Sequence, residues 1–239
     1  MFTALMPRIE IVMAEMPPDF SRGGEYIRHQ SLQRGASMKR EGLILILSAP
    51  SGAGKTSLCR ELFRQFPDMR ESISYTTRSP RPGEVDGEAY HFVSRQAFEC
   101  MVADDAFAEW AVVHDNMYGT ALSTLEEARR NGIDLVLDID CQGARKLKNQ
   151  FDGGVYVFIV PPSMEELRRR LESRSSDSRE VIERRIARAA DEIKESSWYD
   201  YIIINDIFEV ACGELAAIVT AHRRTTFRMQ ETIAKLFDI

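Results

Sequence analysis

The most constraining feature of this sequence is a glycine-rich loop that ends in a Lys-Thr pair. An apolar run at residues 43–48 precedes the loop, and a helical pattern with Leu58, Leu62 and Phe63 follows it. A strand, a glycine-rich loop and a helix in this order are typical of a phosphate-binding loop. The glycines let successive backbone N–H groups surround a phosphate chain, and the helix directs its positive N-terminal end at the same anion. The loop residues are Ala49, Pro50, Ser51, Gly52, Ala53, Gly54, Lys55 and Thr56.

The last two residues of the loop are expected to have separate chemical roles. Lys55 would reach the β- and γ-phosphates of a nucleotide, and the Thr56 hydroxyl would ligate Mg²⁺. Ala49 stands where the strict pattern has its first glycine, a position that tolerates a methyl group. The alternative is a glycine-rich turn before an ordinary helix. The order of strand, loop and helix favours a nucleotide phosphate site over that alternative.

Composition bounds the size, the partners and the location of the protein. With 239 residues, of which 44% are hydrophobic, the chain can bury a full core, and one domain with inserted subdomains is favoured over two. The net charge of −6 argues against a general nucleic-acid binder. The four cysteines are far apart, which argues against zinc and disulfides and predicts a reducing, cytoplasmic location. No apolar run approaches the roughly 18 residues that a membrane span needs, so no membrane partner is expected.

The first 40 residues differ in character from the rest of the chain. They contain several prolines and glycines and charges of both signs, without sustained periodicity. We interpret residues 1–40 as a largely disordered extension, with one short helix over residues 9–16 as an alternative. The acidic residues and the missing hydrophobic region argue against a transit or signal peptide. Met38 precedes the first core strand and is a candidate native start.

From residue 43 onward, apolar strands alternate with helices. Strands are expected at residues 43–48, 133–138, 155–160 and 201–205, with helices between and after them. Residues 71–121 form a mixed region with short β-like pieces and one helical stretch. This alternation predicts an α/β fold with a parallel sheet and helices on both of its faces.

Two arginines lie three residues apart in a segment rich in proline, glycine and hydroxyl groups. Arg78 and Arg81 suit a monophosphate, because the arginine fork binds phosphate oxygens bidentately and stays charged. The alternative is a solvated loop with unpaired arginines.

Five separate blocks of this sequence, in the same order, resemble guanylate kinase. They are SAPSGAGKT at 48–56, SYTTRSPRPGEVDGEAYHFVS at 74–94, FAEWAVVHDNMYGT at 107–120, LDIDCQGA at 137–144 and VPPSMEELRRRLESR at 160–174. The resemblance runs from about Gly42 to the C-terminus. It implies Mg²⁺-dependent transfer of the γ-phosphoryl group of ATP to GMP or dGMP. It also implies a P-loop three-layer fold over residues 41–239, with a parallel-sheet core (41–71 and 122–239), a GMP-binding insert (about 72–121) and a lid (about 170–190).

The resemblance also implies two groups of GMP contacts. Ser74, Arg78, Arg81 and Tyr90 would hold the phosphate of GMP, and Glu109, Tyr118, Thr120 and Asp138 would surround the nucleoside and its base.

Chemistry supports two of these base contacts separately. Guanine presents N1–H and N2–H₂ to a carboxylate such as Glu109, and its O6 accepts from a hydroxyl such as Thr120. Adenine lacks this donor pair, so it would leave polar groups of the site unpaired. A site of this kind can prefer the matching substrate by a factor of roughly 10⁴–10⁵. As isolated residues, Glu109 would be read as a solvated strand residue and Thr120 as a helix N-cap.

A second arginine cluster lies at residues 168–188. The resemblance singles out Arg170, Arg174 and Arg185 as lid residues that reach the phosphates of ATP. Catalysis of phosphoryl transfer is mostly positioning and cationic stabilisation, which suits such a cluster. Charge runs on helices are more often solvated faces, and several of these arginines are expected to be so. The family usually has glycines where Ser173 and Ser175 stand, so the hinge of the lid departs from the pattern.

Several points stay open at the level of sequence. Asp138 and Asp140 follow an apolar strand, where P-loop enzymes often place an acidic residue near Mg²⁺, and either could order a metal-bound water. The amphipathic stretch at 227–237 could pack on the core or on a second subunit of a homo-oligomer.

Two other functions are alternatives at the level of sequence. One is a guanylate-kinase-like scaffold module that binds proteins without catalysis, and the intact phosphate loop with Arg78 and Arg81 argues against it. The other is a kinase for a different nucleoside monophosphate, and Glu109 with Thr120 argues against that reading.

Overall fold

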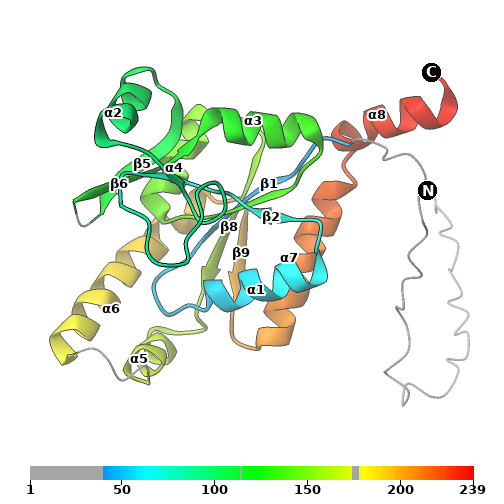
Figure 1. The fold of residues 1–239 in the computed structure, drawn as a ribbon. Helices are drawn as coiled ribbons and strands as arrows, with labels where there is room; N and C mark the ends of the chain where they lie inside the picture. The colour runs from blue at the N-terminus through cyan, green and yellow to red at the C-terminus, as the bar shows by residue number, and fades with distance from the viewer. Residues whose placement is uncertain (1–39, 114, 174–177) are drawn as a thin grey trace, which may run out of the picture. The chain divides into compact units, whose positions relative to one another are not determined.

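A five-stranded parallel sheet forms the centre of the protein (Figure 1). The computed structural model describes residues 40–113, 115–173 and 178–239. The strand order is β2-β7-β1-β8-β9, so the chain leaves the central strand β1 toward both edges of the sheet. All these pairings are parallel, and the carboxyl ends of the strands therefore meet at one edge, beside the glycine-rich loop. The strands are β1 (Ile44–Ser48), β2 (Arg70–Glu71), β7 (Leu135–Asp138), β8 (Gly154–Val160) and β9 (Tyr201–Ile204).

Both faces of this sheet are covered by helices. Leu45 and Leu47 of β1 point to one face, where they belong to the same core as α1 (Lys55–Gln65) and α7 (Phe208–Arg223). Ile44 and Ile46 point to the other face, in the core with α3 (Leu122–Asn131) and α4 (Cys141–Gln150). A strand buried on both sides must be apolar throughout, which is why β1 reads as a continuous apolar run. The expected three-layer α/β fold is confirmed.

Residues 75–121 form a second sheet with its own small core. Its strand order is β4-β3-β6-β5, and β5 and β6 pair antiparallel. Phe98, Phe107 and Met117 are buried together between this sheet and the helix α2. The elements are β3 (Tyr75–Thr76), β4 (His91–Phe92), α2 (Arg95–Ala103), β5 (Phe107–Val113) and β6 (Asn116–Ala121).

Two helices after β8 form a third packed group. Leu167 and Leu171 of α5 (Met164–Glu172) are buried against Ile182 and Ala189 of α6 (Arg179–Lys194). Ser163 caps α5 by accepting a hydrogen bond from the backbone N–H of Glu166 at 3.1 Å, as the capping-box spacing predicts. The turn η1 (Glu195–Trp198) follows α6, and α8 (Thr226–Phe237) ends the chain. None of the described helices is both long and apolar enough to cross a lipid bilayer.

One strand begins later than the sequence pattern predicts. The strand expected at residues 133–138 starts at Leu135, because the buried Asp134 before it forms a charged junction. Its carboxylate accepts hydrogen bonds from the Leu43 backbone N–H at 2.6 Å and from the guanidinium groups of Arg40 and Arg223. The folded unit therefore includes Arg40, whereas the rest of the predicted extension, residues 1–39, lies outside the described residues.

Candidate active site

The glycine-rich loop runs from the end of β1 to the first residue of α1. Gly54 precedes α1 with a φ of 98°, in the left-handed region that favours glycine. A Cβ atom at this position would lie 2.2 Å from Nδ2 of Asn205, so only glycine fits. The same Nδ2 donates a 2.7 Å hydrogen bond to the carbonyl oxygen of Ala53. Asn205 is buried, and it therefore braces the loop from the end of β9.

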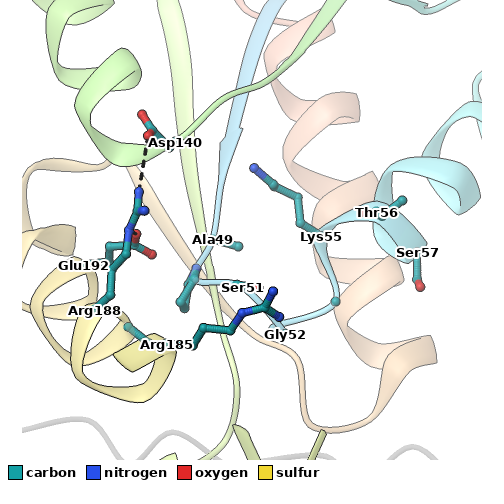
Figure 2. A pocket seen from close by; sticks show the side chains of 13 residues that line it. Ala49, Ser51, Gly52, Lys55, Thr56, Ser57, Asp140, Arg185, Arg188 and Glu192 are labelled. Carbon is teal, nitrogen blue, oxygen red and sulfur yellow. Dashed lines mark hydrogen bonds and ion pairs between the residues drawn. The ribbon is translucent and has the colours of Figure 1, made fainter. Parts of the chain in front are cut away.

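A pocket of about 470 Å³ lies over this loop, and we call it the loop pocket. Figure 2 shows Arg185 and Arg188, both on α6, at one side of it and Lys55, at the start of α1, at the other. The N-terminus of a helix and several cations around one space are suited to a chain of phosphates. The other lining residues are Ala49, Pro50, Ser51, Gly52, Gly54, Thr56, Ser57, Asp140, Ala189 and Glu192.

A second pocket of about 410 Å³ lies between the two sheets, and we call it the insert pocket. It gathers four of the eight residues expected to contact GMP, which are Ser74, Tyr90, Thr120 and Asp138. These residues come from four separate parts of the chain. The remaining lining residues are Glu71, Ser72, Ile73, Glu88, Ala89, Leu137 and Ile139.

An ion pair joins the two pockets. Lys55 lines the loop pocket, Asp138 lines the insert pocket, and the Lys55 ammonium contacts the Asp138 carboxylate. Lys55 also donates a 3.2 Å hydrogen bond to the carbonyl oxygen of Ile139. The side chain of Lys55 is therefore directed from the loop toward the carboxyl end of β7, where the pockets meet.

The predicted phosphate arginines lie beside the aromatic residues of the insert. The Arg78 guanidinium forms a bidentate pair with Glu84, both distances being 2.9 Å, and lies 5.4 Å from the centre of the Tyr90 ring. The Tyr90 ring in turn lies 5.9 Å from that of Tyr118. The Arg81 side chain is exposed, while its backbone N–H donates to Glu84 at 2.7 Å. Hydrogen bonding from Arg78 holds the pKa of Glu84 below its ordinary value, so Glu84 is ionised and keeps the arginine fork oriented.

Glu109 and Thr120 face each other across β5 and β6. The Thr120 hydroxyl donates a 2.8 Å hydrogen bond to Oε1 of Glu109. Burial raises the pKa of the Glu109 carboxyl, although the hydrogen bond from Thr120 opposes this effect. Glu109 also lines a smaller pocket of about 340 Å³ together with Trp110 and Lys146. The pair presents carboxylate acceptors and a hydroxyl at one place, as recognition of a guanine edge requires.

The three lid arginines do not all reach the loop pocket. Arg185 lines it. Arg170 instead pairs with Glu166 at 2.7 Å and donates a 2.9 Å hydrogen bond to the carbonyl oxygen of Asn205. Arg174 lies outside the described residues.

Two residues at this site were not singled out from the sequence. Asn205 follows an apolar strand directly, as Asp138 does, and that position at the carboxyl edge of a parallel sheet was an available signal. Arg188 lies one helical turn beyond Arg185 and therefore shares its face of α6. Its guanidinium lies 2.8 Å from Glu192 and 3.6 Å from Asp140, as Figure 2 shows for the second pair.

The loop pocket offers oxygen donors to a cation but no complete set of ligands. The Thr56 side chain and the Asp140 carboxylate line it. Within residues 40–113, 115–173 and 178–239, no three histidine, cysteine, aspartate or glutamate side chains gather in a way that could hold a metal. Oxygen donors fit Mg²⁺, which keeps several waters and takes phosphate oxygens as further ligands. The donors present are thus compatible with Mg²⁺ that arrives with a nucleotide.

Comparisons with known proteins place these pockets in a family context. Residues 41–222 match the family model described as guanylate kinase. A guanylate kinase of Geobacter metallireducens is 61% identical over 202 residues, which are 84% of this chain and 100% of the relative. A guanylate kinase of Geobacter sulfurreducens is 59% identical with the same coverage. The crystal structure of guanylate kinase from Anaplasma phagocytophilum is 35% identical with a TM-score of 0.58, and the match covers 85% of this chain and 100% of that one. The family match includes both pockets.

Proposed function

The chain belongs to the guanylate kinase family and transfers the γ-phosphoryl group of ATP to GMP, and from this premise we propose which residues carry each part of the reaction. The contact between Lys55 and Asp138 carries the assignment, because it lies where the two pockets meet. Direct transfer needs the attacking oxygen, the γ-phosphorus and the leaving oxygen roughly in line. An oxygen of the GMP phosphate forms the new bond, the bond from the γ-phosphorus to the bridging oxygen breaks, and ADP leaves. We place this event beside Lys55.

ATP is assigned to the loop pocket. Residues 49–56 would surround its phosphates with backbone N–H groups, and Lys55 would follow the migrating phosphoryl group. Arg185 supplies a second cation from α6. Arg170 and Arg174 are proposed to join when the lid closes, since α5 and α6 pack as one group.

The phosphate of GMP is assigned to Ser74, Arg78, Arg81 and Tyr90. Ser74 and Tyr90 line the insert pocket, and Arg78 lies over the Tyr90 ring. The pair with Glu84 uses Nη1 and Nη2 of Arg78 and fixes the orientation of the planar guanidinium, so the phosphate of GMP would take donors that this pair leaves over.

The guanine base is assigned to Glu109 and Thr120, with Tyr118 and Asp138 beside the nucleoside. The Thr120 hydroxyl has one proton, and in this structure it donates to Glu109. Donation to guanine O6 therefore requires that Oε1 of Glu109 accept from guanine N1–H or N2–H₂ instead. Guanine would thus replace the hydrogen bond between Thr120 and Glu109 with one from Thr120 to O6 and others from N1–H and N2–H₂ to Glu109. Adenine offers no such donor pair.

The metal and the moving parts are further proposals. We assign Mg²⁺ to the loop pocket with Thr56 as its protein ligand, and Asp138 or Asp140 as the residue that holds a metal-bound water. When bound, this ion would neutralise and align the phosphate oxygens. We also propose that the insert, about residues 72–121, and the lid, about 170–190, close to exclude water.

A substrate panel tests the base and phosphate assignments together. A coupled assay with ATP and Mg²⁺ would offer GMP, dGMP, AMP, UMP and CMP to the full chain. We expect rapid turnover of GMP and AMP turnover lower by orders of magnitude. Equal turnover of AMP and GMP would contradict the roles of Glu109 and Thr120.

Location and assembly are separate proposals. All four cysteines are free thiols, which supports a reducing, cytoplasmic location. The exposed apolar residues Phe227, Leu236 and Phe237 of α8 support a homo-oligomer in which a second copy covers them. A monomeric mass in light scattering would contradict this assembly.

A further inference from the structure

The carboxylate of Glu109 is confined from two sides by residues of different elements. On one side, the Thr120 hydroxyl of β6 donates to Oε1 at 2.8 Å. On the other side lies Gly143, the third residue of α4, whose missing side chain leaves room for Oε2. Helix α4 packs closely along β5, so this approach is part of the interface between the insert and the core.

A methyl group at Gly143 would crowd the Glu109 carboxylate. A Cβ atom there would lie 3.2 Å from Oε2 of Glu109, 3.6 Å from its Cδ and 3.5 Å from Oδ1 of Asp140. The first distance is shorter than nine in ten contacts that Cβ atoms make, so one partner would have to shift by tenths of an ångström. The helix has little freedom to retreat, because Ala144 and Leu147 are fully buried in the core. The Glu109 carboxylate is therefore the group that would shift.

The backbone does not explain a glycine at this position. Gly143 lies within α4, and it is absent from the glycines with positive φ. Its N–H donates a 2.9 Å hydrogen bond to the capping Asp140, which any residue except proline could do. Glycine is also a poor residue for a helix interior compared with alanine. What remains is the need for space beside Glu109.

We propose that Gly143 is a positioning residue for base recognition, which sets the plane of the Glu109 carboxylate by leaving room for Oε2. The inference rests on the proposed contact between Glu109 and the guanine edge. Both carboxylate oxygens must meet N1–H and N2–H₂ together, so a small rotation of the carboxylate weakens at least one hydrogen bond. Gly143 thus acts through Glu109 and needs no contact with the substrate.

The test compares Gly143→Ala with a matched control, Gly213→Ala, in the full chain. Gly213 lies in α7, and no atom lies within 4 Å of a Cβ placed there. We expect Gly143→Ala to raise the KM for GMP by about threefold to thirtyfold. Misplacement of a substrate-positioning group by 1 Å can lower the reaction rate by a factor on the order of 10², and the shift expected here is smaller. The KM for ATP should stay unchanged. The melting temperature should not fall, because alanine favours the helix. Gly213→Ala should leave all kinetic constants unchanged.

Two further measurements show whether the effect passes through Glu109. Inosine monophosphate lacks the N2 amino group, so the preference for GMP over this analogue should fall in Gly143→Ala. In a Glu109→Gln background, Gly143→Ala should change the KM for GMP by less than about twofold. If Gly143 acts through the Glu109 carboxylate, the effects of the two substitutions are not additive.

The outcomes separate this inference from the proposed function. If Glu109→Gln impairs GMP turnover but Gly143→Ala keeps the wild-type KM and base preference, Gly143 has no positioning role. A lower melting temperature with raised KM for both substrates would also overturn it, as a folding defect. If Glu109→Gln is itself neutral, the assignment of Glu109 fails, and this inference fails with it.

Discussion

The Thr120 hydroxyl donates a 2.8 Å hydrogen bond to Oε1 of Glu109 across the antiparallel strands β5 and β6. Thr120 is only 1% exposed, so its single proton has few partners other than this carboxylate and a bound base. Glu109 is half-buried, and a carboxylate that is withdrawn from water is costly unless its acceptors are used. This relationship underlies the proposed role of Glu109 in base selection, and it makes the ionisation of Glu109 depend on its surroundings.

Replacing the acid with its amide should impair turnover of GMP. We expect Glu109→Gln to lower kcat/KM for GMP by roughly 10² or more, because an amide offers one acceptor and turns an NH₂ toward a guanine donor. Steady-state kinetics on GMP measure this effect. Glu127→Gln, an exposed substitution on α3, is the control and should behave as wild type. Turnover of GMP within about threefold of wild type would show that Glu109 does not read the base.

Glu109 should also give GMP turnover a pH dependence. Burial raises the pKa of this carboxyl above the ordinary value of 4.5, so it takes up a proton at a higher pH than an exposed glutamate. The ionised form accepts both guanine donors, and kcat/KM for GMP should therefore fall as pH decreases through the raised pKa. The phosphate of GMP titrates at about pH 6 as well. The variant Glu109→Gln separates the two titrations, because it loses the effect of the Glu109 carboxyl and keeps that of the GMP phosphate. Identical pH profiles of kcat/KM for the wild type and Glu109→Gln would contradict the prediction.

Cations at the loop pocket should act mainly on the chemical step. We expect Lys55→Ala and Arg185→Ala to lower kcat by roughly 10²–10⁵, with little change in the KM for GMP. Arg174→Ala is expected to behave in the same way. The control is Arg184→Ala, because Arg184 is an exposed neighbour of Arg185 on α6 and does not line the pocket. A large rise in the KM for GMP with a normal kcat would assign these residues to ground-state binding instead.

The insert and the lid should both become protected when substrates bind. The predicted phosphate contacts Arg78 and Arg185 lie outside the strands of the central sheet, on the insert and on the α5–α6 pair, each of which has a small core of its own. A bisubstrate analogue that joins adenosine and guanosine through phosphates should slow hydrogen exchange in residues 72–121 and 170–190. Adenosine triphosphate alone is the control and should protect the lid more than the insert. Unchanged exchange in both segments would contradict closure.

A chain that begins at Met38 should retain the stability and activity of the full chain. The preceding residues contain several prolines and glycines and charges of both signs without sustained periodicity, so we expect no packed apolar face there to offset roughly 1–2 kcal/mol of backbone entropy per ordered residue. The shortened chain keeps Arg40, which pairs with the buried Asp134. Burial opposes ionisation of Asp134, but hydrogen bonds from Arg40 and Leu43 outweigh it and hold its pKa below the ordinary value.

Arg40→Ala in the shortened chain is the matched control. It should lower the melting temperature, because removing one partner of a buried ion pair is destabilising. If removal of residues 1–37 alone lowers the melting temperature by several degrees, or changes the mass measured by light scattering, these residues contribute to stability or assembly and the prediction is wrong.

Features encoded by neighbouring residues were predictable from the sequence. The loop at residues 49–56 depends on a contiguous run of glycines, a lysine and a hydroxyl, and the strand β1 on a contiguous apolar run. Four residues of the insert pocket were predicted as GMP contacts only because they belong to motifs. Their gathering into one pocket from residues 71–74, 88–90, 120 and 137–139 is a property of the folded chain.

The glycine-rich loop, the alternation of strands and helices and the resemblance to the family could therefore be recognised before folding was considered, because each rests on local pattern. Three contacts are visible only in the folded chain: Asn205 braces Ala53 across 152 residues, Lys55 reaches the end of β7 across 84 residues, and Gly143 lies against Glu109. These contacts depend on which strands are neighbours in the sheet and on how closely helices pack against them. Sheet order and packing distance arise from burial of the whole core, and no single segment carries them.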